Sequence, residues 1–308
     1  MVKQHNSDFG KQRVLSTIGQ ATIPLLSGVL VDWHSSSIGY SDYGPTVYMG
    51  TGLTLLASLI ILRLNVKVDI SKQDVFKDLM RLISMVEVNL FLLIIMVMGS
   101  NHGFIENYLF LYLKELNAPT YLLGLTLTVG CMAAVPVMYV ADAVVKKLGR
   151  PLIFMLSFFC YSIRHIGYSY IIDPWMVFPF ELLEVFTYQI TWVAACTLCP
   201  ILAPKGLLAT MTGLTGSLHY SVGRGLGALL GGYLIGAFGL VKSFRIFAVI
   251  SLVSGFVYVG IHFLFLKKRL EAKEAEREAE LEEDRRKQEE EELQPMINTS
   301  SRRPSLQM

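Results

Sequence analysis

Residues 151–198 read PLIFMLSFFCYSIRHIGYSYIIDPWMVFPFELLEVFTYQITWVAACTL, two long apolar runs joined by a turn at Asp173. Charged residues interrupt both runs. Arg164 lies nine residues before the turn, and Glu181 and Glu184 lie eight and eleven residues after it. At about 1.5 Å of helical rise per residue, all three would lie roughly 12 to 16 Å below one membrane surface. Because an ionised side chain at that depth costs about 2.5 to 3.5 kcal/mol, the stretch predicts the polar interior of a transporter.

Apolar runs of this kind repeat along the chain. Of its 308 residues, 53% are hydrophobic, and the mean hydropathy is +0.48. A run of about 20 apolar residues can cross a bilayer as a helix, so we predict an all-α polytopic membrane protein with eight transmembrane helices. The predicted spans are Val14–Val31, Pro45–Leu62, Leu90–Tyr112, Tyr121–Asp142, Pro151–Ile172, Trp175–Leu198, Leu207–Ala237 and Phe244–Leu266.

Lysine and arginine residues flank these spans unevenly. With the N-terminus in the cytoplasm, fifteen of the flanking basic residues lie on the cytoplasmic side. Only Lys114, Lys242 and Arg245 then lie outside. Because positive charges close to membrane spans are retained in the cytoplasm, both termini of this multi-pass protein are predicted to be cytoplasmic.

The order of the segments predicts four regions. Residues 1–66 hold the last two helices of an N-terminal bundle, 67–88 a central cytoplasmic loop, 89–266 a C-terminal six-helix bundle, and 267–308 a charged cytoplasmic tail. Many transporters consist of repeated helical bundles around a central site. We therefore expect the chain to be a fragment, with four further N-terminal helices in the same protein. The alternative is an unusual eight-helix membrane protein.

Glycine dominates the seventh predicted span. Gly223, Gly227 and Gly231 repeat every four residues, as do Gly232 and Gly236. A face of small residues lets two membrane helices approach backbone to backbone. The pattern fits either plain tight packing or a helix that slides during gating.

Several motifs resemble those of one known family. They are Gly10–Arg13 (GKQR), Gly103–Leu113 (GFIENYLFLYL), Arg164–Gly167 (RHIG), Leu183–Val185 (LEV) and Gly223–Gly227 (GRGLG). In these stretches the chain resembles the lactose-permease-like branch of the major facilitator superfamily, and within it the animal group of domain-containing protein 6. The resemblance implies that the eight spans correspond to helices 5–12 of the twelve-helix major facilitator fold.

The resemblance also implies roles for the charged residues. Arg164 occupies the position of the permease's helix-nine arginine, and Glu184 that of the helix-ten glutamate that takes part in proton coupling. Glu181 stands where the permease has a histidine, and the helix-eight carboxylate has no counterpart in Tyr121–Ala141. The resemblance thus implies proton symport of a solute that differs from a lactose-like sugar.

The spacing of the acids supports a proton-coupling site made of Glu184, Glu181 and Arg164. Residues at i, i+3 and i+7 share one helix face, which groups Glu181, Glu184 and Tyr188. Burial favours the protonated form of a carboxylic acid, and a facing arginine favours the ionised form. A movement that separates Arg164 from Glu184 would therefore load or release a proton. The alternative is a fixed ion pair that holds two helices together.

A second group of polar residues predicts a solute-binding site. Asn101, Glu106 and Asn107 lie in the third span, where Glu106 either binds solute or pairs with Arg164. The remaining candidates are Tyr188, His219 and Arg224. Arg224 would attract an anionic solute, or else pair with an acid on a helix outside this chain.

Other function classes lack support in the sequence. We find no nucleotide-binding loop, metal-ligand spacing or nucleophile triad, so an enzyme and a cofactor are not predicted. The net charge of +2 does not indicate a nucleic-acid partner. In the tail, Arg302-Arg303-Pro304-Ser305 predicts phosphorylation at Ser305.

The sequence therefore predicts the C-terminal part of a secondary active transporter in a lipid bilayer. It would move a small polar solute by alternating access, coupled to protons. The alternative is a transporter-shaped membrane receptor or regulator that binds a ligand without transporting it.

An antibody against the charged tail tests the expectation of a fragment. Because four helices are expected in addition to these eight, the native protein should give an immunoblot band well above 34.5 kDa. A sole band at 34.5 kDa would identify the eight-helix form as native and would favour the receptor or regulator.

Overall fold

A computed structural model describes residues 9–40, 42–63, 75–204 and 206–277, together with residues 279, 282 and 286. These residues form helices and connecting turns, with no strand among them. The chain divides into two units, Met1–Gly260 and Ile261–Met308. The first unit contains the candidate site and is described below. Ser305, the predicted phosphorylation site, lies outside the described residues.

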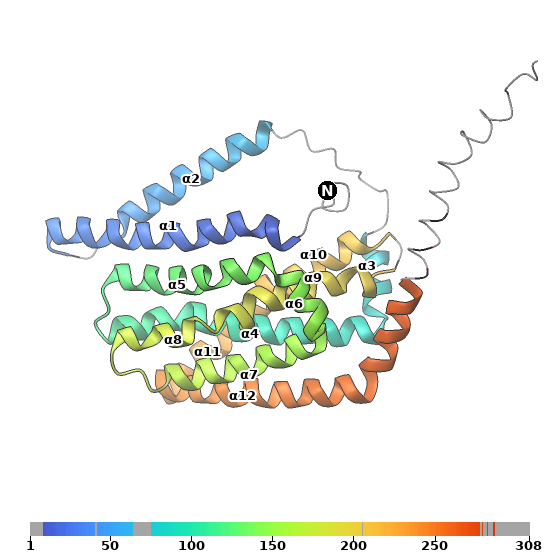
Figure 1. Ribbon diagram of the computed structural model, residues 1–308. Helices are drawn as coiled ribbons and strands as arrows, with labels where there is room; N and C mark the ends of the chain where they lie inside the picture. The colour runs from blue at the N-terminus through green and yellow to red at the C-terminus, as the bar shows by residue number, and fades with distance from the viewer. Residues whose placement is uncertain are drawn as a thin grey trace, which may run out of the picture. The chain divides into compact units, whose positions relative to one another are not determined.

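The helices follow the order of the predicted spans (Figure 1). Their bounds are α1 Phe9–Ile38, α2 Gly44–Arg63, α3 Val75–Ile83, α4 Val86–Glu115, α5 Thr120–Tyr139, α6 Ala141–Leu148, α7 Arg150–Tyr168, α8 Phe178–Glu181, α9 Ile190–Leu202, α10 Leu208–Ser217, α11 Arg224–Phe238 and α12 Leu240–Ile261.

Five helical segments among the described residues are long and apolar enough to cross a membrane. They are Gly44–Arg63, Val86–Glu115, Thr120–Tyr139, Val185–Leu202 and Leu240–Arg277. The chain is thus an all-α membrane protein, as its hydropathy predicts. The predicted number of eight crossings stays a prediction, and so do the boundaries of the four predicted regions.

Several predicted spans differ from single regular helices, and two of them bear on the candidate site. In place of one helix over Trp175–Leu198, the chain forms a 3-10 turn (η2, Pro174–Val177), the short helix α8, a π-helical turn (η3, Val185–Gln189) and then α9. Pro179 lies in the first turn of α8, where proline is tolerated but its ring disfavours a continuous α-helix with the preceding residues, so it accounts for the separation of α8 from the 3-10 turn.

A second π-helical turn interrupts the glycine-rich span. This turn (η4, Leu218–Gly223) joins α10 to α11. π-Turns widen a helix locally and often occur at functional sites. The predicted span Leu207–Ala237 is therefore one helical run whose register changes in its middle.

Helices α1 and α5 lie side by side along their lengths (Figure 1). Glycines allow this approach: a Cβ on Gly28 would meet the backbone of Thr120, and one on Gly124 would meet the backbone of Pro24. Such contacts require small residues on both helices. The packing brings α1 against the same helix that forms one wall of the candidate site.

A carboxylate on α1 also caps α5. Asp32 accepts hydrogen bonds from the backbone N–H groups of Thr120 (3.2 Å) and Tyr121 (2.6 Å). Those groups have no partner within their own helix, and the residue before them, Pro119, provides no side-chain cap. A carboxylate at a helix N-terminus also interacts favourably with the helix dipole. Asp32 therefore fixes the end of α5 against α1.

Helix α4 packs equally closely on η4 and α11. A Cβ on Gly227 would meet the backbone of Ser100, and a Cβ on Gly103 would meet the backbone of Arg224. Glycines on both helices make this contact, which confirms tight packing for the repeat of Gly223, Gly227 and Gly231, whereas Gly236 of the second repeat faces open space. This contact fixes where the backbone of Arg224 lies relative to α4.

Two neighbouring glycines of α11 give a matched test of this packing. Gly227 faces the α4 backbone, whereas Gly225 faces open space. We expect Gly227→Ala to destabilise the protein, because overpacking costs about 1 to 3 kcal/mol. Gly225→Ala should leave stability unchanged or raise it, since alanine is favoured over glycine in a helix by about 1 kcal/mol. Thermal unfolding of the two variants in detergent measures the difference, and equal unfolding temperatures would contradict it.

Candidate functional site

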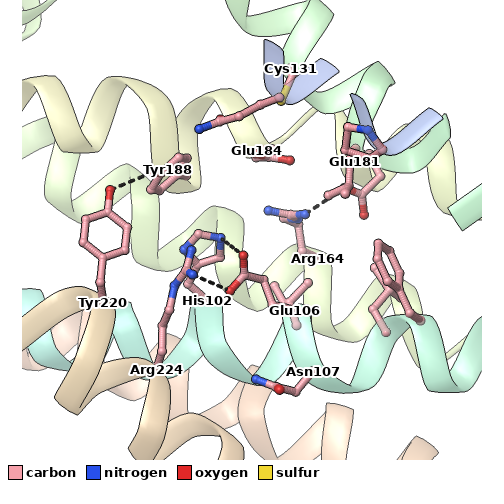
Figure 2. Close-up of a pocket in the computed structure, with 16 residues that line it drawn as sticks. His102, Glu106, Asn107, Cys131, Arg164, Glu181, Glu184, Tyr188, Tyr220 and Arg224 are labelled. Carbon is pink, nitrogen blue, oxygen red and sulfur yellow. Dashed lines mark hydrogen bonds and ion pairs between the residues drawn. The ribbon is translucent and has the colours of Figure 1, made fainter. Parts of the chain in front are cut away.

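A cavity of about 720 Å³ lies inside the helical unit, between α1, α4, α5, α7, α8 and α11 (Figure 2). Its volume falls within the range of about 300 to 1,000 Å³ that is usual for small-molecule sites. The polar residues that line it are Gln20, His102, Glu106, Asn107, Arg164, Glu181, Glu184, Tyr188, Tyr220 and Arg224.

Arg164 on α7 lies at the centre of a buried network. Its Nη2 forms an ion pair with Glu181 at 3.1 Å. Its Nε donates to the Tyr168 hydroxyl at 2.9 Å, and its Nη1 donates to Thr187 at 2.8 Å. The Tyr168 hydroxyl in turn donates to the second oxygen of Glu181 at 2.5 Å. The hydrogen-bonding groups of the Arg164 guanidinium and the Glu181 carboxylate thus find partners in each other and in Tyr168 and Thr187.

The pairing of Arg164 differs from the expectation in one respect. The sequence places Glu181 and Glu184 on one helix face, and both line the cavity. The arginine pairs with Glu181, not with Glu184. Between the two acids lies a two-residue turn, Leu182 and Leu183, where the hydrogen bonding of a regular α-helix is interrupted, so the two acids do not lie on one regular helix.

The Glu184 carboxylate lies against the backbone of α5. A Cβ on Gly130 would overlap one of its oxygens, so the absence of a side chain there makes room for the carboxylate. Within the part of the chain that the structure describes, this carboxylate makes no hydrogen bond or ion pair. Glu184 is therefore the acid of the cavity whose charge is not already matched.

A second ion pair lies on the α4 side of the cavity. Arg224 Nη1 and Glu106 Oε2 are 2.9 Å apart, and the other Glu106 oxygen lies 3.8 Å from Nε2 of His102. Arg224 also packs its guanidinium over the Tyr220 ring, 5.0 Å from the ring centre. The ion pair bears on the partners that the sequence left open for these two residues. Glu106 pairs with Arg224 and not with Arg164, and Arg224 finds its acid within this chain.

Aromatic residues from η3 and η4 line one part of the cavity. The hydroxyl groups of Tyr188 and Tyr220 are 2.7 Å apart (Figure 2). His219 does not line the cavity; it lies behind these rings, with its Nε2 3.5 Å from Nδ1 of His102. The two π-turns supply Tyr188, His219 and Tyr220, which accounts for the convergence of these residues.

The predicted solute-binding asparagines divide into two roles. Asn107 lines the cavity, and its amide donates to the Gly103 carbonyl at 2.7 Å. Asn101 is buried away from the cavity, where its side-chain oxygen accepts from Ser251 at 2.5 Å and lies 3.2 Å from Nε2 of His165. His165 is fully buried among aromatic rings, so it is a packing residue without lipid contact.

Some residues of the site were not assigned to it from the sequence. Helical spacing groups Tyr161, Arg164 and Tyr168 on one face, although it gives Tyr168 no role in the site. Thr187 lies one turn after Glu184, so the same spacing could have identified it. Gln20 on α1 and Cys131 on α5 also line the cavity. Isolated polar or small residues in apolar spans carry no comparable signal.

Comparison with known proteins identifies relatives of one kind. A model of the MFS_1 like family matches residues 1–246. Major facilitator superfamily domain-containing protein 6-like protein B of Xenopus laevis is 22% identical over 153 residues, which cover 50% of this chain and 25% of the relative. The 6-like proteins of Mus musculus and Homo sapiens are each 20% identical, over 50% and 48% of this chain and 26% and 25% of their own lengths. The matched region therefore spans about a quarter of these relatives.

The buried ion pair predicts a characteristic pattern of stability. Removing one partner leaves an uncompensated buried charge, which costs about 3 to 5 kcal/mol. We therefore expect Arg164→Met and Glu181→Gln each to lower the unfolding temperature, and the double variant to recover most of that loss. Glu184→Gln is the matched control, because its carboxylate has no ion-pair partner among the described residues. Additive losses in the double variant, measured by thermal unfolding in detergent, would show that the two residues do not interact.

Proposed function

Because the chain belongs to the MFS_1 like family, a family of transporter-type membrane proteins, we propose that it is the C-terminal part of a secondary active transporter. In this proposal it moves a small polar solute across the bilayer by alternating access, and the movement is coupled to protons. The first four helices of the twelve-helix fold would belong to the same protein.

The observation that carries the proposal is the charge arrangement of the cavity. Arg164 pairs with Glu181 and Arg224 pairs with Glu106, whereas the Glu184 carboxylate has no partner among the described residues. A half-buried carboxylate without a partner is costly when ionised, because the apolar surroundings replace part of its hydration. A proton on Glu184 removes that cost, so this residue is the proton carrier of the proposal.

The two ion pairs would then serve different purposes. Arg164 and Glu181 hold α7 against α8 beside Glu184, and they set the electrostatic environment in which its proton is held. Arg224 and Glu106, half exposed to the cavity, would contact solute together with Asn107 and Tyr188. Asn101 and His219 would support these residues from behind.

Alternating access requires helices that can move past each other without losing their packing. The contacts of α1 with α5 and of α4 with α11 are made through glycines and backbone. At these glycines no large side chain separates the two backbones, which suits a rocking movement. Both pairs of helices border the cavity.

Replacement of the proposed proton carrier tests this function. The native full-length protein is placed in proteoliposomes with a pH indicator, and an amine, a sugar or a carboxylate is added. We expect at least one of these solutes to cause proton movement across the membrane, which the indicator reports. Glu184→Gln should reduce that movement at least tenfold, because the amide cannot exchange a proton. Glu115→Gln, at the exposed outer end of α4, is the matched control and should behave as the native protein does.

Two results would count against the proposal. Proton movement that persists in Glu184→Gln would remove this residue from the mechanism. Saturable binding of a solute without any solute flux would favour the alternative, a transporter-shaped receptor or regulator.

A further inference from the structure

The arginines of the cavity are already engaged by carboxylates. All three guanidinium nitrogens of Arg164 donate, to Tyr168, Thr187 and Glu181. Arg224 pairs with Glu106 at 2.9 Å. An anionic solute at Arg164 would have to displace Glu181, which would then lie unpaired in the cavity. Arg224 keeps one buried donor, Nε, without a hydrogen-bond partner among the described residues, but an anion there would add a second unbalanced negative charge to the cavity. The arrangement therefore disfavours an anion.

The balance of charges in the cavity favours a cation instead. Its fixed charges among the described residues are two arginines and three glutamates, Arg164, Arg224, Glu106, Glu181 and Glu184. With every group ionised, one negative charge is left over, and it belongs to Glu184. A low-dielectric cavity favours neutrality, so this carboxylate needs either a proton or a cation.

The other groups that face the cavity do not supply that cation. Helix α1 contributes Gln20 and Pro24, which are neutral, and α5 contributes Leu127 and Cys131. The remaining titratable groups in or directly behind the lining are His102 on α4, Tyr161 and Tyr168 on α7, Tyr188 on η3, and His219 and Tyr220 on η4. His102 lies beside Glu106, and Figure 2 shows Glu184 across the cavity from both.

We propose that the solute carries one positive charge, on an amine or a quaternary ammonium group, and that this group binds beside Glu184 in exchange for a proton. The inference rests on the proposed function and adds the chemical class of its solute. In the exchange, the O–H bond of the neutral Glu184 carboxyl breaks and the proton leaves to water. The ionised carboxylate then pairs with the incoming cation, so the charge of the cavity does not change.

The rest of the lining suits such a solute. The rings of Phe110, Tyr188 and Tyr220 border the cavity, and aromatic faces attract ammonium groups. Ile105, Leu109 and Leu127 provide apolar surface for the body of the molecule. The site therefore combines an unpaired carboxylate, aromatic rings and an apolar wall in one cavity.

Competition between proton and cation has a consequence for coupling. If one carboxylate holds either a proton or the solute, then solute entering from one side of the membrane releases a proton to that side. The protein would exchange protons for an organic cation. This direction differs from the symport that the resemblance to lactose permease implies.

Three probes with one skeleton and different charges test the proposal. Phenethylammonium is cationic, phenylacetamide is neutral and phenylacetate is anionic; tetramethylammonium is a second cation of different shape. With the native protein in nanodiscs and a pH indicator in weak buffer, we expect the amine to bind and to release about one proton for each molecule bound. Its apparent Kd should fall about tenfold per pH unit of increase, as long as Glu184 is protonated in the absence of ligand.

Variants identify the group that releases the proton. Glu184→Gln should weaken binding of the amine at least tenfold and abolish proton release, whereas Glu115→Gln should change neither. Glu184→Asp retains a carboxyl group and should keep proton release, which provides a test if the glutamine variant does not fold. Gly130→Ala should weaken amine binding without changing any charge, because the new methyl group displaces the Glu184 carboxylate.

Each outcome bears on one of the two proposals. The cationic solute is overturned if neither cation releases a proton, if release persists in Glu184→Gln, or if the amide or the acid binds as tightly as the amine. Proton-coupled, Glu184-dependent flux of a neutral solute would overturn it while leaving the proposed function in place. Amine binding with proton release but no flux in proteoliposomes would instead support the cation site and overturn transport.

Discussion

The buried pair of Arg164 and Glu181 is the interaction around which the site is arranged. Neither charge can be buried alone, because each would cost several kcal/mol without a partner. Tyr168 and Thr187 complete the hydrogen bonding of the pair, so it is satisfied from within α7, α8 and η3. Since one arginine can neutralise only one acid, this pairing leaves the neighbouring Glu184 unmatched. The unusual chemistry of the cavity follows from that imbalance.

Close backbone packing provides the framework that holds these charges in place. Glycines on both α4 and α11 bring the two helices together, and the contact carries Arg224 to within 2.9 Å of Glu106. Glycines likewise join α1 to α5, where Gly130 leaves space for the carboxylate of Glu184. The small residues therefore do more than allow tight packing, because they also set the positions of the charged side chains.

The balance of charges links the proposed solute to the proposed coupling. Two ion pairs and one further carboxylate leave little net attraction for an anion, and the remaining carboxylate can be neutralised by a proton or by a cation but not by both. Binding and proton release then become one event at one residue. In this scheme the two π-turns matter because they direct Tyr188 and Tyr220 toward the same part of the cavity.

The sequence by itself determined the all-α membrane fold, because long apolar runs in a bilayer must satisfy their backbone groups within helices. It also predicted that Arg164, Glu181 and Glu184 would come together, as they do in the lining of one cavity, and that glycines of α11 would pack tightly. Only the tertiary structure decided which acid pairs with which arginine. That choice depends on the rotation of each helix and on the break after α8, and neither the spacing of residues nor their hydropathy specifies those.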